Sequence, residues 1–140
     1  MRSFKQDYRT GISNEMRCLD FFNYYFDEIF KKTPPTHSFD FETDKRFIEL
    51  KSRTCLASSY PTTMVGMDKI KIASQCDKPV HFAFLFNDGS LYEIEYNAEI
   101  FKNFETRLFQ RNDRIDHQDV CKEYCYIPVR LLEEIGNVSI

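Results

Sequence analysis

The apolar run Val80–Phe86 (VHFAFLF) constrains the fold more than any other segment of the chain. A short apolar run that is rich in aromatic residues is typical of a strand buried on both faces. The turn sequence Asn87-Asp88-Gly89-Ser90 follows it, and residues 91–96 are expected to return as a partner strand. His81 lies inside the run, where we expect a hydrogen-bonded core histidine rather than a ligand. The run therefore predicts a sheet that is covered on both sides.

Helical and strand periodicities alternate along the rest of the chain, which predicts an α/β fold with a central mixed β-sheet flanked by helices. Apolar residues recur at helical spacing after residue 12, and the Thr33-Pro34-Pro35-Thr36 segment ends that pattern. The expected elements are a helix over 12–32, strands over 38–42 and 46–52, a helix over 63–76, strands over 80–86, 91–96, 104–110 and 123–127, and a short last helix over 129–135 after Pro128.

The composition fits one globular domain spanning residues 1–140. No stretch approaches the roughly 20 apolar residues of a membrane span, and the first residues lack a secretory signal, so we expect a cytoplasmic or nuclear protein without a membrane partner. The five cysteines include no Cys-x-x-Cys pair, which favours reduced thiols over a zinc site. The net charge of −3 counts mildly against a general nucleic-acid binder.

The strands predicted over 38–42 and 46–52 bring acidic residues together. Glu49 and Lys51 are two positions apart, so both point to one face of the sheet. If the hairpin closes through Asp44 and Lys45, Asp40 lies opposite Glu49. Like charges directly opposite each other are destabilising, and a bound cation would convert their repulsion into coordination.

Glu15 supports the same interpretation from a different element. On the expected first helix it lies in line with the apolar stripe that should face the sheet, where a carboxylate is costly unless it is paired or binds a metal. Hard oxygen ligands at an open site select Mg²⁺ or Mn²⁺. Such an ion polarises a phosphate and activates water, and a neighbouring lysine orients that water and neutralises developing charge. The plain alternative is solvated strand charge, although Glu49-Leu50-Lys51 is the chain's only acidic-x-Lys tripeptide.

These residues give the chain a resemblance to the PD-(D/E)xK nuclease superfamily over residues 12 to 96, in particular to its small viral and phage members. Asp40 and the Glu49-Leu50-Lys51 tripeptide resemble the superfamily motif, and Glu15 resembles the acidic residue that many members place on their first helix. The resemblance implies a restriction-endonuclease-like α-β-β-β-α-β core and metal-dependent phosphodiester hydrolysis. It also implies Asp40, Glu49, Glu15 and the backbone carbonyl of Leu50 as ligands of Mg²⁺ or Mn²⁺, and Lys51 as the catalytic lysine.

Four further residues are candidates for contact with nucleic acid, DNA in preference to RNA: Arg53, Tyr60, Lys69 and Lys71. Lysines on a helix bind phosphate or simply form a solvated face, and a tyrosine stacks on a base or packs in a core. The alternative function is a catalytically inactive nuclease-fold module that binds nucleic acid or a protein partner. A homodimer is also expected, since a two-fold pair would present two sites to two strands.

Overall fold

The computed structural model describes residues 4–109 and 121–139, with side chains from residue 15 onward. Its elements in chain order are α1 (Phe4–Phe26), β1 (Lys31–Lys32), β2 (Phe41–Glu42), β3 (Phe47–Ser52), β4 (Thr62–Gly66), α2 (Met67–Gln75), β5 (Val80–Leu85), β6 (Ser90–Glu95), α3 (Ala98–Phe101), β7 (Glu105–Phe109), β8 (Lys122–Pro128), a 3₁₀ turn (Val129–Leu131) and β9 (Glu133–Asn137).

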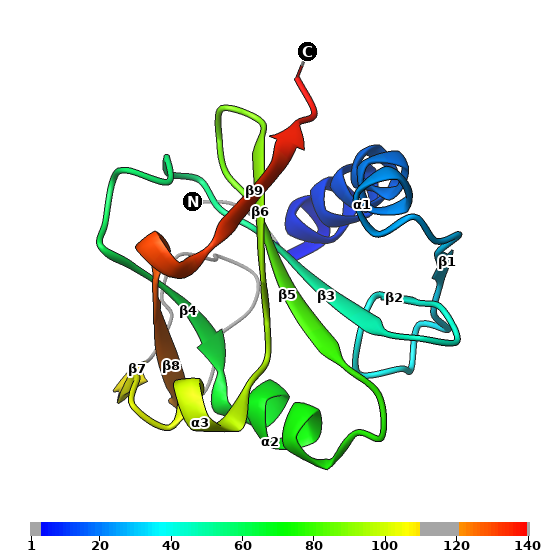
Figure 1. The fold of residues 1–140 in the computed structure, drawn as a ribbon. Coiled ribbons are helices and arrows are strands. Elements are labelled where there is room, and N and C mark those ends of the chain that lie inside the picture. Colours follow the sequence, from blue (N-terminus) through cyan, green and yellow to red (C-terminus); the bar gives the residue numbers. More distant parts are fainter. Residues whose placement is uncertain (1–3, 110–120, 140) are drawn as a thin grey trace.

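In the described residues the strands form two sheets (Figure 1). The larger has the order β1-β2-β3-β5-β6-β9, with β3 and β5 parallel and the other neighbours antiparallel. The smaller has the order β4-β8-β7 and is antiparallel. The predicted α/β class with a central mixed sheet is therefore confirmed.

The strand β5 lies in the middle of the larger sheet and all six of its residues are buried, as the apolar run predicted. Its alternate side chains belong to two different cores. Phe82 and Phe84 pack with residues of α2, α3 and the smaller sheet, whereas Ala83 and Leu85 pack with Phe22 and other residues on the α1 side. Figure 1 shows α1 against one face of the sheet and α2 with the smaller sheet on the other.

Helix α1 ends at Phe26, so the predicted helix over residues 12–32 was wrong at both ends. Asp27 has φ 54°, the left-handed conformation that commonly follows a helix. The N–H of Glu28 then donates to the carbonyl of Asn23, and the N–H of Phe30 donates to the Asn23 side chain at 2.8 Å. This C-cap turns the chain toward β1 and leaves Ile29 exposed.

Two further predictions were wrong, and both failures involve strands that pair over long sequence distances. The predicted helix over 63–76 starts only at Met67, because residues 62–66 form β4 and pair with β8. The predicted helix over 129–135 is a 3₁₀ turn followed by β9, which pairs with β6. At Gly136 the backbone of β9 comes so close to the Phe21 ring that a Cβ would lie 3.0 Å from it.

The turn after β5 was predicted correctly. Gly89 has φ 88°, which a residue with a side chain rarely adopts. The Asp88 carboxylate accepts hydrogen bonds from the N–H and the hydroxyl of Ser90, at 3.1 and 2.6 Å.

Among the described helices, none combines the length and the apolar character needed to cross a membrane.

Candidate metal and nuclease site

Asp40 lies directly before the short strand β2, beside β3. The observed register pairs Phe41 with Ile48 and Glu42 with Phe47, which is the register predicted for this hairpin. The N–H of Asp40 donates to the carbonyl of Ile48 at 2.9 Å. The Asp40 carboxylate in turn accepts the N–H of Leu50 at 2.8 Å. These two hydrogen bonds fix the carboxylate against the strand that carries Glu49 and Lys51.

Glu49 is buried, with 3 % of its surface exposed, and points to the same face of the sheet as Lys51. The Lys51 Nζ lies 3.3 Å from the Glu49 Oε2. Burial raises the pKa of Glu49 to about 7, with a further increase from the charge of Asp40, while Lys51 and Lys69 act to lower it. Burial and the charge of Asp40 thus disfavour the ionised form of Glu49, and the two lysines oppose that effect.

Lys69 reaches the same carboxylate from α2. Its Nζ lies 3.6 Å from the Glu49 Oε2 and also donates a hydrogen bond to the carbonyl of Ser38. The Lys69 ammonium group further lies 5.8 Å from the centroid of the Phe39 ring. Lys69 thus ties α2 both to Glu49 and to the segment that leads into Asp40.

Glu15 reaches Asp40 from α1, on the opposite face of the sheet. The pKa of Glu15 is raised chiefly by burial; the charge of Asp40 and a side-chain hydrogen bond with it raise this pKa further, while Lys32 lowers it. Lys32, on β1, forms an ion pair with the Glu15 Oε2. Asp40 thus interacts with carboxylates on both sides of the sheet, Glu15 on the α1 side and Glu49 on the α2 side.

The structure thus brings together six residues, which we call the carboxylate–lysine site: Glu15, Lys32, Asp40, Glu49, Lys51 and Lys69. Lys32 was not anticipated from the sequence, because the Lys31-Lys32 pair fits the basic C-terminal end of the helix predicted over residues 12–32. Lys32 lies at the site because α1 ends earlier, at Phe26.

The other sequence candidates lie outside this cluster. Arg53 donates hydrogen bonds to the Thr63 hydroxyl, at 2.9 Å, and to the carbonyl of Met64, and its guanidinium group lies over Phe84. Tyr60 is 64 % exposed in the segment between β3 and β4. Lys71 is exposed on α2. Leu50, whose carbonyl was the remaining candidate ligand, lies on β3 opposite Ala83 of β5.

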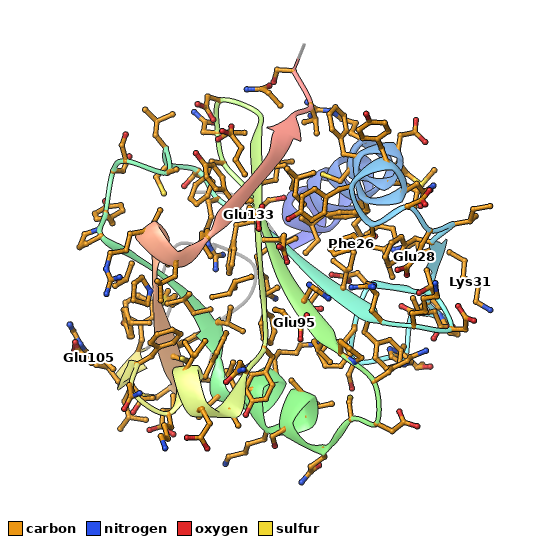
Figure 2. The ribbon with its side chains drawn as sticks, in the orientation of Figure 1. Phe26, Glu28, Lys31, Glu95, Glu105 and Glu133 are labelled. Atoms are coloured by element: carbon orange, nitrogen blue, oxygen red, sulfur yellow. The ribbon has the colours of Figure 1, made fainter. Side chains whose placement is uncertain are left out.

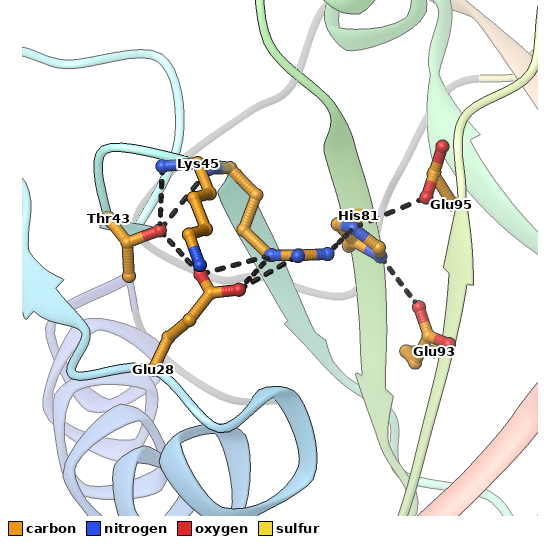
Figure 3. A network of polar contacts seen from close by, with 7 residues as sticks. Glu28, Thr43, Lys45, His81, Glu93 and Glu95 are labelled. Atoms are coloured by element: carbon orange, nitrogen blue, oxygen red, sulfur yellow. Dashed lines mark hydrogen bonds and ion pairs between the residues drawn. The ribbon is translucent and has the colours of Figure 1, made fainter.

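A second polar network lies in the core on the α1 side, and the sequence did not predict it (Figure 3). Glu93 was expected on a half-solvated strand but is buried, and it accepts a hydrogen bond from the His81 Nδ1 at 2.8 Å. The His81 Nε2 faces the Arg46 Nη1 at 3.1 Å. Because a guanidinium group only donates, Nε2 is the acceptor and the proton lies on Nδ1. Arg46 also pairs with Glu28 at 2.8 Å. His81 is thus the satisfied core histidine that was predicted.

The donor chemistry of the carboxylate–lysine site fits a divalent cation, although lysines now contact two of its carboxylates. Three carboxylates with a nearby backbone carbonyl are the hard oxygen ligands that Mg²⁺ and Mn²⁺ prefer. Within residues 15–109 and 121–139, however, no group of three or more His, Cys, Asp or Glu side chains is arranged to hold a metal ion. Glu15 is paired with Lys32, and Glu49 with Lys51 and Lys69. A bound cation would therefore replace lysine contacts at Glu15 and Glu49.

Comparison with known proteins found a matching family. A family model described as "Phage putative PDDEXK endonuclease" matches residues 4–135. No curated protein and no solved structure matched the chain. The matched stretch contains every residue of the carboxylate–lysine site.

Proposed function

Since the chain belongs to a family of phage PD-(D/E)xK endonucleases, we propose that it hydrolyses phosphodiester bonds in DNA at the carboxylate–lysine site, with Mg²⁺ or Mn²⁺ as cofactor. Membership of a nuclease family carries the coarser part of this statement, which is nuclease activity on nucleic acid. The choice of DNA, the metal requirement and the roles of individual residues are our proposal.

The position of Asp40 between two other carboxylates is the observation that supports the proposal most. Its charge raises the pKa of both Glu15 and Glu49. Such mutual repulsion costs free energy in the folded chain, and a divalent cation among the three groups would reverse its sign. The Leu50 N–H holds one Asp40 oxygen at 2.8 Å, and the Asp40 carboxylate also interacts with the Glu15 side chain.

We assign the metal ligands to Asp40, Glu49, Glu15 and the carbonyl of Leu50. When bound, the cation would act as a Lewis acid on the phosphate and lower the pKa of a coordinated water. Lys51, whose side chain is 38 % exposed, orients the attacking water and neutralises charge that develops on the phosphate oxygens. Lys69, whose Nζ lies 3.6 Å from the Glu49 Oε2, favours the ionised form of Glu49.

Two exposed residues outside the carboxylate–lysine site are assigned to the substrate. Tyr60 is available to stack on a base and Lys71 to contact a phosphate, since both are exposed. Arg53 and Lys69 already bond to protein groups, and in our proposal they shape the floor on which the backbone of the nucleic acid lies.

The proposal is tested by incubating the protein with labelled duplex, single-stranded and branched DNA, and with RNA, in Mg²⁺, Mn²⁺ or EDTA. We expect DNA cleavage that EDTA abolishes, and Mn²⁺ binding measurable by calorimetry. Asp40→Asn, Glu49→Gln and Lys51→Met should each reduce cleavage by about 10²-fold or more. Glu99→Gln is the matched control, because this glutamate pairs with Lys102 on α3 and its side chain is 82 % exposed.

Two outcomes contradict the proposal. A folded protein that binds no Mn²⁺ and cleaves nothing, yet binds DNA, is the catalytically inactive module that the sequence left as the alternative. Cleavage that survives in Asp40→Asn and Glu49→Gln would place the activity elsewhere in the chain.

A further inference from the structure

We infer that Lys32 is a substrate-binding residue, whose ammonium group holds Glu15 in the metal-free protein and contacts a substrate phosphate once that carboxylate binds a cation. This inference rests on the proposed function. It assigns a role to a residue that neither the sequence motif nor the family match singles out.

The position of Lys32 is built by the fold. It pairs with Phe41 across the β1–β2 ladder, and its Nζ lies 6.0 Å from the centroid of that ring. From there it crosses to Glu15 on α1. The Lys32 side chain is 45 % exposed, whereas the Glu15 side chain is 15 % exposed. The lysine thus faces solvent on one side and a metal-ligand candidate on the other, where an incoming phosphate group would meet it.

Formal charges at the site favour an exchange of partners. The three carboxylates, Glu15, Asp40 and Glu49, are balanced by the three ammonium groups of Lys32, Lys51 and Lys69. Adding a divalent cation to this balanced set leaves an excess of positive charge. A phosphodiester backbone supplies the missing negative charge, and the displaced ammonium group of Lys32 is then free to bind it.

Lys31 provides an internal comparison on the same strand. Successive side chains of a strand point to opposite faces, so Lys31 points away from Glu15. Its Nζ lies 3.8 Å from the Glu42 Oε1 and its side chain is 76 % exposed. Figure 2 shows Lys31 projecting outward at the periphery beside β1. The two lysines match in charge, length and strand, and only Lys32 contacts the carboxylate–lysine site.

The inference predicts that replacing Lys32 has opposite effects on the two ligands. Without its ammonium group, Glu15 loses a competitor for the cation, so Mn²⁺ alone should bind more tightly. The complex with DNA loses a phosphate contact, so DNA should bind more weakly when a metal is present. A purely structural lysine would weaken both, because its loss would disorder the site as a whole.

The experiment compares wild type, Lys32→Met, Lys32→Arg and Lys31→Met. Calorimetry gives the Mn²⁺ affinity without DNA. Fluorescence anisotropy gives the affinity for labelled DNA in Ca²⁺ and in EDTA, over a series of salt concentrations, with a gel to verify that the DNA stays intact. Thermal unfolding verifies that each variant folds, and Lys32→Gln replaces Lys32→Met if the latter does not.

For Lys32→Met we expect Mn²⁺ affinity to rise by about three- to tenfold and DNA affinity in Ca²⁺ to fall by about tenfold, with the slope of log K against log salt smaller by about one. Lys32→Arg should restore DNA binding, and Lys31→Met should leave Mn²⁺ affinity unchanged. The inference is overturned if Lys32→Met matches Lys31→Met, or if its Mn²⁺ affinity falls. A wild-type protein that binds no Mn²⁺ and cleaves no DNA overturns the proposed function instead.

Discussion

The carboxylate of Asp40 accepts the backbone N–H of Leu50 at 2.8 Å, across the end of the β2–β3 ladder. Asp40 is thereby fixed beside β3, between carboxylates that lie on opposite sides of the sheet. Its charge reaches Glu15 on the α1 side and Glu49 on the α2 side. Asp40 therefore links the electrostatics of Glu15 and Glu49, in addition to the effects of burial and of the lysines.

Asp40→Asn should lower the pKa of both Glu15 and Glu49, because it removes a charge that raises both. Carboxyl ¹³C chemical shifts, followed by NMR as a function of pH in the metal-free protein, report the two values directly. Asp44→Asn, in the turn before β3, is the control and should change neither value. If the pKa of Glu49 stays near 7 in Asp40→Asn, the two carboxylates do not interact as the structure indicates.

Glu49 should make the metal-free protein less stable as the pH rises. Its pKa is about 7 in the folded chain against an ordinary value of 4.5, so the folded state binds more protons between these values. Stability then falls as the pH rises from 4.5 to 7, and the full penalty is present above pH 7. Glu49→Gln removes the titration and should be more stable than wild type at pH 8, by up to about 3 kcal/mol.

Urea unfolding at pH 5, 7 and 8.5 in EDTA measures this difference. At pH 5 the wild type and Glu49→Gln should be close in stability, and the gap should widen toward pH 8.5. A gap that is equal at all three pH values would show that the variant acts through packing. Glu99→Gln again serves as the exposed control.

Lys69→Met should raise the pKa of Glu49, because it removes one of the two ammonium groups that lower it. Metal binding requires the ionised carboxylate, so Mn²⁺ binding should move to higher pH by a similar amount. The measurements are NMR titration without metal and calorimetry at several pH values. Lys71 is exposed on the same helix, so Lys71→Met should change neither the pKa of Glu49 nor the pH dependence of Mn²⁺ binding. Equal behaviour of the two variants would remove Lys69 from the site.

Arg46→Met should destabilise the protein by about 3 kcal/mol without a direct effect on the carboxylate–lysine site. The change leaves the Glu28 carboxylate, whose side chain is 8 % exposed, and the His81 Nε2 without the guanidinium group. Urea unfolding measures the loss, and Mn²⁺ affinity below the unfolding range should be unchanged. Lys45→Met, at the position before Arg46, should lower the free energy of unfolding much less. A stable Arg46→Met would mean that water replaces the guanidinium at both partners.

The sequence predicted the parts of the fold that depend on short, local stretches of residues. The buried strand β5, the turn at Gly89 and the β2–β3 register all follow from short stretches of chain, and all were confirmed. The strands β4 and β9 were wrongly predicted as helical because their partners, β8 and β6, are far away in the sequence. Pairing with those partners overrides the weak local preference of each segment.

In the site, too, positions that depend on a local pattern were predicted, and positions that depend on the path of the chain were not. Glu49 and Lys51 were placed on one face by the alternation of a single strand, and the contact of 3.3 Å between them confirms this placement. Lys32 was missed because its position depends on the left-handed turn at Asp27, where an aspartate takes the conformation more often adopted by glycine. For the buried pair of His81 and Glu93, the sequence predicted a hydrogen-bonded core histidine but did not predict that Glu93 is its partner.

The C-cap at Asp27 has a consequence for how this site assembles. By reversing the chain directly after α1, it allows all members except Lys69 to come from one uninterrupted segment between residues 15 and 51. Closing short loops costs little entropy, so these contacts can form early in folding, before the distant strands of the smaller sheet find each other. Substitutions in β4, β7 and β8, which supply none of the six residues, should therefore affect later folding steps more than the assembly of this site.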